Sequence, residues 1–336
     1  MPSNIAPILI ALALPVSLAL SAFFTWIVWR RMVAMQIGQT VRSDGPESHL
    51  KKMGTPTLGG VGILTALIVV CALVVAALSA KGEALPLRML AVLGLALAYG
   101  ALGFADDWPK VRYKRPLGLK ARVRLPIEFA LAAAFAYVMV RTGTMTTQHS
   151  PLQLIPFQPD LIWGAFVLFV IVGGANAVNL TDGLDGLAAG VSAIVAIGLA
   201  VICTALGHAD LAVMSLAVAG VSAGFLWLNA APAQIFMGDV GSLGLGAALA
   251  GIAVAARSEL VFGFFGIVFV VEALSVILQV LYFKVSKGKR LFRMAPFHHH
   301  LELGGLPETK VTARLWLVTA MAVSIGLATI WIIASV

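Results

Sequence analysis

Apolar stretches long enough to cross a lipid bilayer recur along the whole chain, and short polar segments separate them. A transmembrane helix needs about 20 consecutive, mostly apolar residues, so each stretch predicts one membrane-spanning helix. The predicted spans are residues 5–29, 58–80, 87–105, 122–141, 161–179, 186–207, 210–228, 241–257, 261–283 and 312–335. The gaps leave no room for a soluble domain, although 30–57 and 284–311 could each hold a short amphipathic or re-entrant helix. We therefore expect residues 1–336 to form a single all-α polytopic membrane domain.

Composition agrees with this pattern, because 60% of the residues are hydrophobic, 11% are charged and the mean hydropathy is +0.98. Soluble globular domains do not have such a composition. The first span is too long for a signal peptide, and Arg30 and Arg31 follow it rather than precede it. We expect it to remain in the mature chain. Cys71 and Cys203 lie inside apolar spans without metal-ligand spacing, so they are assigned no function.

The basic residues are unevenly distributed along a chain whose net charge is +8. Nineteen of the twenty-three Lys and Arg residues fall in the first, third and ninth connections between spans. The positive-inside rule places these connections in the cytoplasm and both termini in the periplasm. The sequence pI near 9.8 does not indicate nucleic-acid binding, because no extramembrane domain is present to hold nucleic acid.

Five polar segments all fall on the cytoplasmic side of this topology, and they hold most of the carboxylates and histidines. They are residues 42–60, 104–124, 176–186, 229–242 and 292–308. Charged side chains near lipid are costly and usually functional. This distribution indicates an intramembrane catalyst with one active site on the cytoplasmic face.

The segment 104–124 begins with two adjacent acids, Asp106 and Asp107, which repel each other and require a cation or a shared proton nearby. Lys110 and Lys114 lie on roughly the same helical face if the helix continues. A solvated helix end with ordinary intrahelical ion pairs is the alternative for this pair taken alone.

The segment 176–186 places Asn179, Asp182 and Asp185 three residues apart, which predicts one stripe of oxygens along a helix. It contains no Lys or Arg, so its acids require a metal ion or a cationic substrate group. Capping of the next helix by Asp182 is a competing explanation, but it leaves Asp185 unexplained.

The segment 229–242 contains one charge, Asp239, between Gly238 and Gly241 and just before a helix start. A helix N-terminus with glycines and Ser242 is suited to a phosphate or a carboxylate, and Mg²⁺ commonly joins a carboxylate to substrate phosphates. Phe236 could stack on a planar base, although packing is the more usual role of such an aromatic residue.

The segment 292–308 contains His298, His299 and His300. Three consecutive histidines cannot all face one metal from a regular helix, which argues against a zinc site. We expect contact with an anionic group such as phosphate, and a solvated loop is the alternative. In segment 42–60, Lys52 and Thr57 could contact an anionic or sugar-bearing substrate, or form a rigid lead into the second span.

These segments together resemble a known family. The motifs are RSDGPESHLKKMGTPTLGG at 42–60, ADD at 105–107, NAVNLTDGLDGLA at 176–188, FMGDVGSLGLG at 236–246 and APFHHHLELGG at 295–305. They are similar to the phospho-N-acetylmuramoyl-pentapeptide transferases, of the polyprenyl-phosphate N-acetylhexosamine-1-phosphate transferase superfamily, over essentially the whole chain. The triple His and segment 42–60 distinguish this family from relatives that transfer N-acetylglucosamine-1-phosphate. Leu301 and Gly304 stand where an aromatic residue and a lysine are more usual, which bears only on fine contacts of that loop.

The resemblance implies transfer of phospho-MurNAc-pentapeptide from its UDP-linked form to undecaprenyl phosphate, giving lipid I and UMP with Mg²⁺ as cofactor. It further implies a homodimer in the bacterial inner membrane. Asp239 would be the Mg²⁺ ligand, and Asp106 and Asp107 the catalytic pair that deprotonates or otherwise activates the lipid phosphate. The remaining implied site residues are Asn179, Asp182, Asp185 and Phe236 at the nucleoside and catalytic centre, His298, His299 and His300 at phosphate or sugar, and Lys52, Thr57, Lys110, Lys114, Asn229 and Gln279 as further substrate contacts.

Two alternatives remain open at this point. One keeps the chemistry and changes the donor to UDP-N-acetylglucosamine. The other is a proton- or cation-coupled transporter, which predicts acids near mid-span and inverted repeats. Only Glu128 and Glu272 lie well inside apolar spans, and no convincing internal repeat is visible, so transport is the weaker alternative.

Overall fold

The computed structural model describes residues 5–36, 52, 54–112, 118–142 and 161–335, and all regular structure in these ranges is helical. The helices are α1 (Ala6–Ala34), α3 (Gly60–Ser79), α4 (Leu87–Arg112), α5 (Ala121–Arg141), α6 (Leu161–Thr181), α7 (Leu187–Ala205), α8 (Ala209–Asn229), α9 (Gly238–Ala255), α10 (Glu259–Phe265), α11 (Ile267–Val285), α12 (Phe297–Glu302) and α13 (Glu308–Ser335). Ten of the described helices are long and apolar enough to cross a membrane. The predicted all-α chain with ten spans is confirmed.

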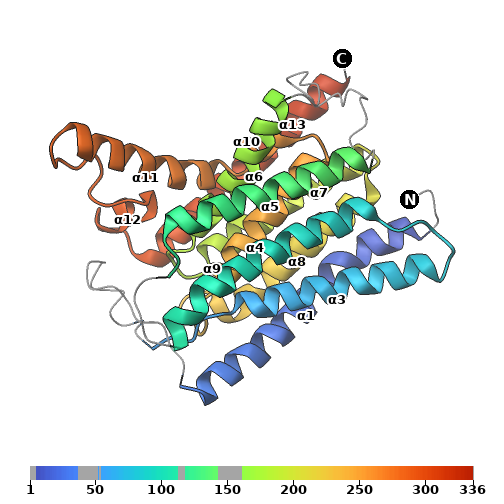
Figure 1. The fold of residues 1–336 in the computed structure, drawn as a ribbon, viewed down its shortest axis with the longest axis horizontal. Helices are drawn as coiled ribbons and strands as arrows, with labels where there is room; N and C mark the ends of the chain where they lie inside the picture. The colour runs from blue at the N-terminus through green and yellow to red at the C-terminus, as the bar shows by residue number, and fades with distance from the viewer. Residues whose placement is uncertain (1–4, 37–51, 53, 113–117, 143–160, 336) are drawn as a thin grey trace.

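The helices form a bundle in which three spans are central (Figure 1). The most apolar window of α9 is 89% buried, and those of α7 and α8 are each 78% buried, whereas α1, α5 and α11 reach only 22%. Helix α9 packs against α4, α6 and α3, and α8 packs against α1 and α7. Exposed Leu, Ile, Val and Phe side chains cover the outer helices, as expected for surfaces that face lipid.

The contact between α4 and α9 is very close at Gly103. A Cβ atom added there would lie 2.2 Å from the backbone carbonyl oxygen of Asp239, so only glycine fits. The absence of a side chain lets the first turn of α9 lie against the backbone of α4, one turn before Asp106 and Asp107. This packing brings carboxylates together that are more than a hundred residues apart in the sequence.

Several helix boundaries differ from the prediction, including those of α4, α9 and the span at 261–283. Helix α4 continues to Arg112 instead of ending at 105, α9 begins at Gly238 instead of 241, and the span predicted at 261–283 is divided at Gly266 into α10 and α11. The first two differences share a cause, because hydropathy ends a span at its first charges while the helical hydrogen bonds continue beyond the apolar part. Asp106, Asp107 and Lys110 therefore lie on α4, and Asp239 lies on α9, rather than in loops.

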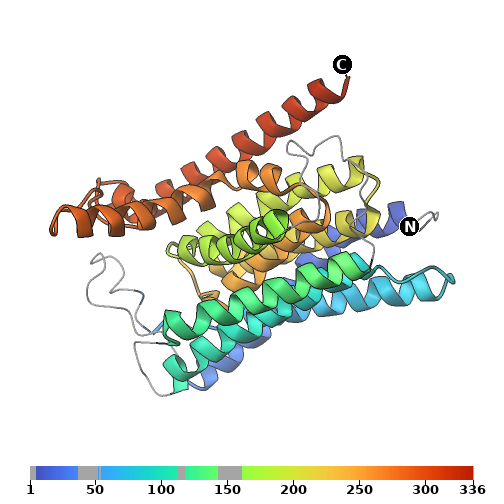
Figure 2. The same ribbon diagram turned by 45° about the horizontal axis from the view of Figure 1, so that its top comes forward.

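Both ends of the described chain lie at one end of the bundle, and the charged end of α4 lies at the other (Figure 1). Helices α11 and α12 extend away from the bundle at that charged end (Figure 2). Helix α12 confirms the short helix predicted within 284–311. The short helix that segment 30–57 could hold would fall mostly on residues outside the described ranges. The assignment of the two ends to cytoplasm and periplasm remains a prediction.

Candidate active site

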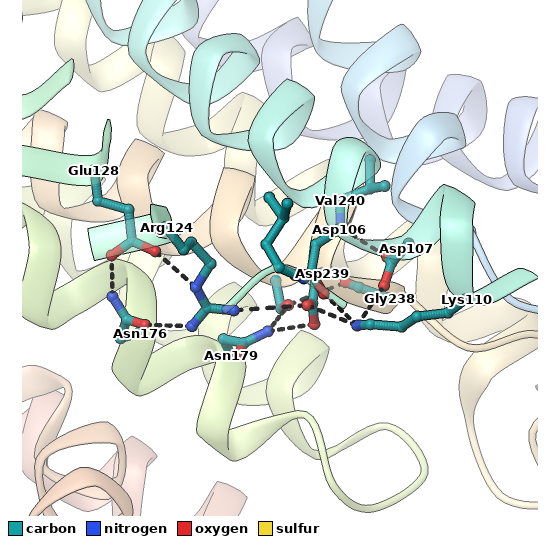
Figure 3. A network of polar contacts seen from close by, with 12 residues as sticks. Asp106, Asp107, Lys110, Arg124, Glu128, Asn176, Asn179, Gly238, Asp239 and Val240 are labelled. Atoms are coloured by element: carbon teal, nitrogen blue, oxygen red, sulfur yellow. Dashed lines mark hydrogen bonds and ion pairs between the residues drawn. The ribbon is translucent and has the colours of Figure 1, made fainter. Parts of the chain in front are cut away.

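Three carboxylates from two helices converge at the charged end of the bundle. Asp106 and Asp107 come from α4, and Asp239 comes from the first turn of α9. One oxygen from each carboxylate lies within 4.8 Å of the others. Asp106 and Asp107 are buried and Asp239 is partly buried. The two polar segments predicted to meet do so here (Figure 3).

The ammonium group of Lys110 lies at the point where these carboxylates meet (Figure 3). Its Nζ contacts Asp106 Oδ2 and lies 3.2 Å from Asp107 Oδ1 and 3.1 Å from Asp239 Oδ2. The continuation of α4 across Pro109 places Lys110 one turn after the acidic pair. The cation expected beside Asp106 and Asp107 is therefore present, and it also contacts the distant Asp239.

Backbone amides hold the other oxygens of the adjacent pair. The Leu119 N–H donates to Asp106 Oδ1 over 2.6 Å, and the Val240 N–H donates to Asp107 Oδ2 over 3.2 Å. The start of α9, for which the sequence suggested a phosphate or a carboxylate, thus binds the carboxylate of Asp107. Each carboxylate is fixed by one oxygen and presents the other to the common centre.

Asp239 is held in the same manner by a side chain. Asn179 Nδ2 donates to Asp239 Oδ1 over 2.8 Å and lies 2.9 Å from Ser242 Oγ. The remaining oxygen, Oδ2, faces Lys110, and Arg124 Nη1 lies 3.7 Å from it. Asn179 therefore holds one carboxylate of this centre in place.

Arg124 belongs to a buried network that sequence reasoning did not include in the site. Its Nε lies 3.0 Å from Glu128 Oε1, and its Nη2 donates to Asn176 Oδ1 over 2.8 Å. Asn176 Nδ2 in turn donates to Glu128 Oε2. Arg124 and Glu128 are four residues apart on α5, and this spacing was the available signal. Glu128, noted as a mid-span acid, is thus paired.

The donor set of this centre fits a hard divalent cation. The three converging atoms are all carboxylate oxygens, the ligand type that Mg²⁺ prefers. A positive group already lies among them, which shows that the geometry favours a cation there. Asp239, Asp106 and Asp107 are therefore the described residues able to hold Mg²⁺.

The stripe predicted for Asn179, Asp182 and Asp185 is wrong, because α6 ends at Thr181. Asp182 and Asp185 lie in the loop beyond the helix, so the three oxygens do not share one helical face. Capping by Asp182 is also not observed, since Gly186 occupies the N-cap of α7.

Asp185 is neutralised from another part of the chain, contrary to the expectation of an unpaired acid. Lys52 Nζ lies 2.7 Å from Asp185 Oδ1 and also contacts Glu308 Oε1. The Ala233 N–H donates to Asp185 Oδ2 over 2.9 Å. Lys52 is 133 residues away from Asp185 in the sequence, so the residues of the loop itself did not reveal this partner. These contacts join segment 42–60 to the loop after α6 and to the start of α13.

Asp182 is electrostatically coupled to the carboxylate centre. Burial, together with the negative charges of Asp239, Asp107 and Asp185, raises the pKa of Asp182 to about 7. At neutral pH a carboxyl group with this pKa is ionised only in part, and a cation bound nearby would lower its pKa.

Two comparisons with known proteins bear on this centre. Residues 89–257, which include Asp106, Asp107 and Asp239, match glycosyl transferase family 4. A phospho-N-acetylmuramoyl-pentapeptide-transferase from Francisella tularensis subsp. tularensis (strain WY96-3418) is 42% identical over 342 residues, covering 92% of this chain and 90% of the relative. The chain belongs to the phospho-N-acetylmuramoyl-pentapeptide transferases. The predicted family and transferase class are confirmed.

In this member of the phospho-N-acetylmuramoyl-pentapeptide transferases, two predicted substrate contacts support the centre or its loops. Thr57 is buried, and its Oγ1 lies 3.3 Å from the position a Cβ of Gly238 would occupy. Asn229 Oδ1 accepts the Gly186 N–H over 3.1 Å, and its Nδ2 donates to Ile235 O over 2.9 Å. Thr57 therefore borders the centre, and Asn229 shapes the loop after α8.

Two other predicted contacts hold loops against neighbouring segments. Phe236 is partly buried, and its backbone N–H donates to Pro56 O over 2.8 Å. Gln279 Oε1 accepts the Leu291 and Phe292 N–H groups over 3.1 and 2.8 Å, which ties the chain after α11 back onto that helix. Lys114 lies outside the described ranges.

The three histidines have different hydrogen-bond partners, and the rings of His298 and His299 contact each other edge to face with centroids 4.1 Å apart. His299 Nδ1 pairs with Glu302 Oε2 over 2.8 Å. His300 Nδ1 accepts the Arg293 N–H over 3.1 Å, and its ring stacks on Phe297. Neither contact includes the carboxylate centre.

His298 lies against the loop after α6. Its side chain is fully buried, and its Nδ1 lies 3.0 Å from Glu272 Oε2. Its Nε2 has no hydrogen-bond partner among the described residues and would lie 2.3 Å from a Cβ atom on Gly183. Glu272, the second mid-span acid, thus holds a histidine that lies against Gly183, in the loop containing Asp182. Both mid-span acids are paired, which removes the observation that favoured a transporter.

Proposed function

We propose that this chain transfers phospho-MurNAc-pentapeptide from UDP-MurNAc-pentapeptide to undecaprenyl phosphate, giving lipid I and UMP. The observation that carries the proposal is the convergence of Asp106, Asp107 and Asp239 on one cation position in a chain that matches a named transferase over 92% of its length. We place the reaction at the cytoplasmic face of the bacterial inner membrane. The family resemblance also supports a homodimer.

Asp239 would hold Mg²⁺, and Asp106 and Asp107 border the same position. The bound ion would neutralise negative charge that builds on the bridging phosphate oxygens as UMP leaves. A lipid phosphate oxygen forms a bond to the donor phosphorus that carries the sugar. The bond from that phosphorus to the oxygen of the uridylyl phosphate breaks, and UMP leaves with the electron pair.

The chain's own residues prepare the acceptor and the donor for this exchange. The Asp106–Asp107 pair accepts the proton of the lipid phosphate, which increases the negative charge on the attacking oxygen. Fixing each carboxylate through one oxygen keeps the other aimed at the reacting phosphates without reorganisation. Phe236 would stack on uracil, and His298 would contact phosphate or sugar.

The direct test is synthesis of lipid I by the purified protein in detergent. UMP release and lipid I are measured with undecaprenyl phosphate and UDP-MurNAc-pentapeptide, with Mg²⁺ and after chelation. We expect product only with the divalent cation, and inhibition by a uridine-nucleoside analogue. Product at the same rate in excess chelator would contradict the metal assignment.

The donor specificity is tested in the same assay. UDP-N-acetylglucosamine replaces the pentapeptide donor at equal concentration, and we expect no UMP release. Efficient release from that donor would instead favour the alternative transferase, which shares the chemistry but not the peptide-bearing substrate.

A further inference from the structure

The position of Lys110 has a consequence for how the metal binds. Its Nζ is in contact with Asp106 and within 3.2 Å of one oxygen from each of Asp107 and Asp239. These are the same three residues whose oxygens could hold a metal ion. An ammonium group and a divalent cation cannot occupy one position together.

The carboxylates have little freedom to form a second, separate position. Their outer oxygens accept hydrogen bonds from Leu119, Val240 and Asn179. A carboxylate that rotated toward another point would lose such a bond, and an unpaired buried donor costs about 1–3 kcal/mol. The three inner oxygens therefore define one cation position.

Lys110, in contrast, is able to move. Its side chain is 30% exposed, while those of Asp106 and Asp107 are 4% and 8% exposed. A lysine ammonium is a compact charge on a flexible four-carbon stem. Of the groups at this centre, the lysine is thus the one that can leave.

We propose that Lys110 is a tethered cation that holds the carboxylate centre in the metal-free protein and is displaced from it when Mg²⁺ binds. This inference rests on the Mg²⁺ requirement of the proposed function. Before displacement, Lys110 and Arg124 supply two positive charges against the three carboxylates. This keeps the acids together without a metal.

Displacement would also connect metal binding with binding of the nucleotide donor. The released ammonium lies on the flexible stem beside the metal position, where the donor's pyrophosphate must bind. A diphosphate gives Lys110 a new anionic partner after it leaves the carboxylates. Metal and donor are therefore expected to bind more tightly together than separately.

The first experiment measures the environment of the Lys110 amine directly. The purified protein is treated with an amine-acetylating reagent, without metal and with saturating Mg²⁺, and labelling is quantified by mass spectrometry. Lys120, an exposed lysine at the start of α5, is the internal reference. We expect Mg²⁺ to increase Lys110 labelling severalfold relative to Lys120. Unchanged or reduced labelling would show that the lysine stays among the carboxylates.

The second experiment measures metal affinity without any turnover. Mn²⁺ is titrated by electron paramagnetic resonance into the wild-type protein, Lys110→Met and Lys110→Ala, with Lys120→Met as the matched change of charge. Removing the competing ammonium should tighten Mn²⁺ binding about tenfold, because close charges interact strongly away from bulk water. The Lys120 variant should bind like the wild type. Equal or weaker binding by both Lys110 variants overturns the proposal.

These results are separable from those for the proposed function. If Mn²⁺ binds none of the proteins while lipid I synthesis proceeds, the displacement proposal fails and the transferase stands. If labelling and affinity change as expected but no lipid I forms, the cation position stands and the assigned reaction fails.

Discussion

Two charged clusters lie toward opposite ends of α4, and they are built differently. Near the start of the helix, Arg88 binds both oxygens of Asp210, with Nε and Nη2 at 2.9 and 2.5 Å. Near its other end, eighteen residues and about 27 Å further along the axis, Asp106 and Asp107 meet Asp239 around one lysine.

The two clusters differ in the balance of positive and negative charge rather than in how deeply they are buried. The guanidinium of Arg88 carries one positive charge and donates a hydrogen bond to each oxygen of Asp210. The charge of this carboxylate is therefore neutralised, and both its oxygens are hydrogen-bonded. The three-carboxylate centre exceeds its nearby positive groups, and its inner oxygens share one focus. Lys110 and Arg124 do not balance all the negative charge of the three carboxylates. This excess of negative charge, directed at one point, distinguishes a cation site from a structural ion pair.

The strongest test of this difference is Asp239→Asn, which removes one charge and one inner oxygen from the centre. We expect UMP release to fall by roughly 10³-fold, because metal and transition-state stabilisation are both lost. The melting temperature in detergent should remain near that of the wild type. Turnover near the wild-type rate in the folded variant would remove Asp239 as the metal ligand.

Asp107→Ala tests whether the centre acts in chemistry rather than in donor binding. We expect loss of activity of roughly 10²–10³-fold, while calorimetry still detects binding of the nucleotide donor. The Val240 amide loses its acceptor in this variant, so the melting temperature is measured in parallel. Loss of donor binding by a folded Asp107→Ala protein would point to a structural role.

The matched change in the other cluster is Asp210→Asn. It leaves Arg88 without its charged partner, and breaking such a partly buried pair should cost about 1–3 kcal/mol of stability. Thermal unfolding should therefore shift downward while UMP release per folded molecule stays unchanged. A specific loss of turnover at wild-type stability would contradict the division between the two clusters.

The comparison also explains which features the sequence could reveal. Hydropathy identified ten spans because the bilayer fixes the length of each apolar run, and Asp106, Asp107 and Asp239 stand out as charges within short polar segments. Long-range pairing was not visible. Lys52 reaches Asp185 across 133 residues, a contact that depends on helix packing rather than on local spacing.

The different contacts of the three histidines could not be predicted from the sequence for a similar reason. Adjacent residues on a short helix point in different directions, so one motif gave three environments. Only the packing of α12 on α11 shows that His298 meets Glu272. The site's chemistry was therefore predictable from residue types, whereas the partners of each residue required the fold.

Glu272→Gln tests this histidine with a smaller expected effect. The variant keeps a hydrogen-bond acceptor for His298 Nδ1 but removes the charge that orients the ring. We expect kcat to fall about tenfold with little change in KM, as for other residues that orient a reacting group. Glu302→Gln, which alters the partner of His299, is the control and should have little effect. Equal losses in the two variants would mean that His298 has no special role.

The pH dependence of stability tests whether Asp182 is coupled to the carboxylate centre, and it is the smallest effect expected. Burial, with the charges of Asp239, Asp107 and Asp185, raises the pKa of Asp182 from 3.8 to about 7 in the folded protein. The folded chain therefore retains a proton that the unfolded chain has already released between these values. Stability is lost as pH rises through this window.

In chelator, the melting temperature of the wild-type protein should decline as the pH rises from about 4 to about 7, since the folded state binds more protons than the unfolded state there. Asp182→Asn cannot ionise at this position and should show a shallower decline.

Mg²⁺ should also reduce the wild-type slope, because a bound cation offsets the negative charges that oppose ionisation of Asp182. Parallel curves for the two proteins would show that Asp182 does not sense the carboxylate centre. A slope altered by Mg²⁺ in the wild type but not in the variant would assign that coupling to this one carboxyl group.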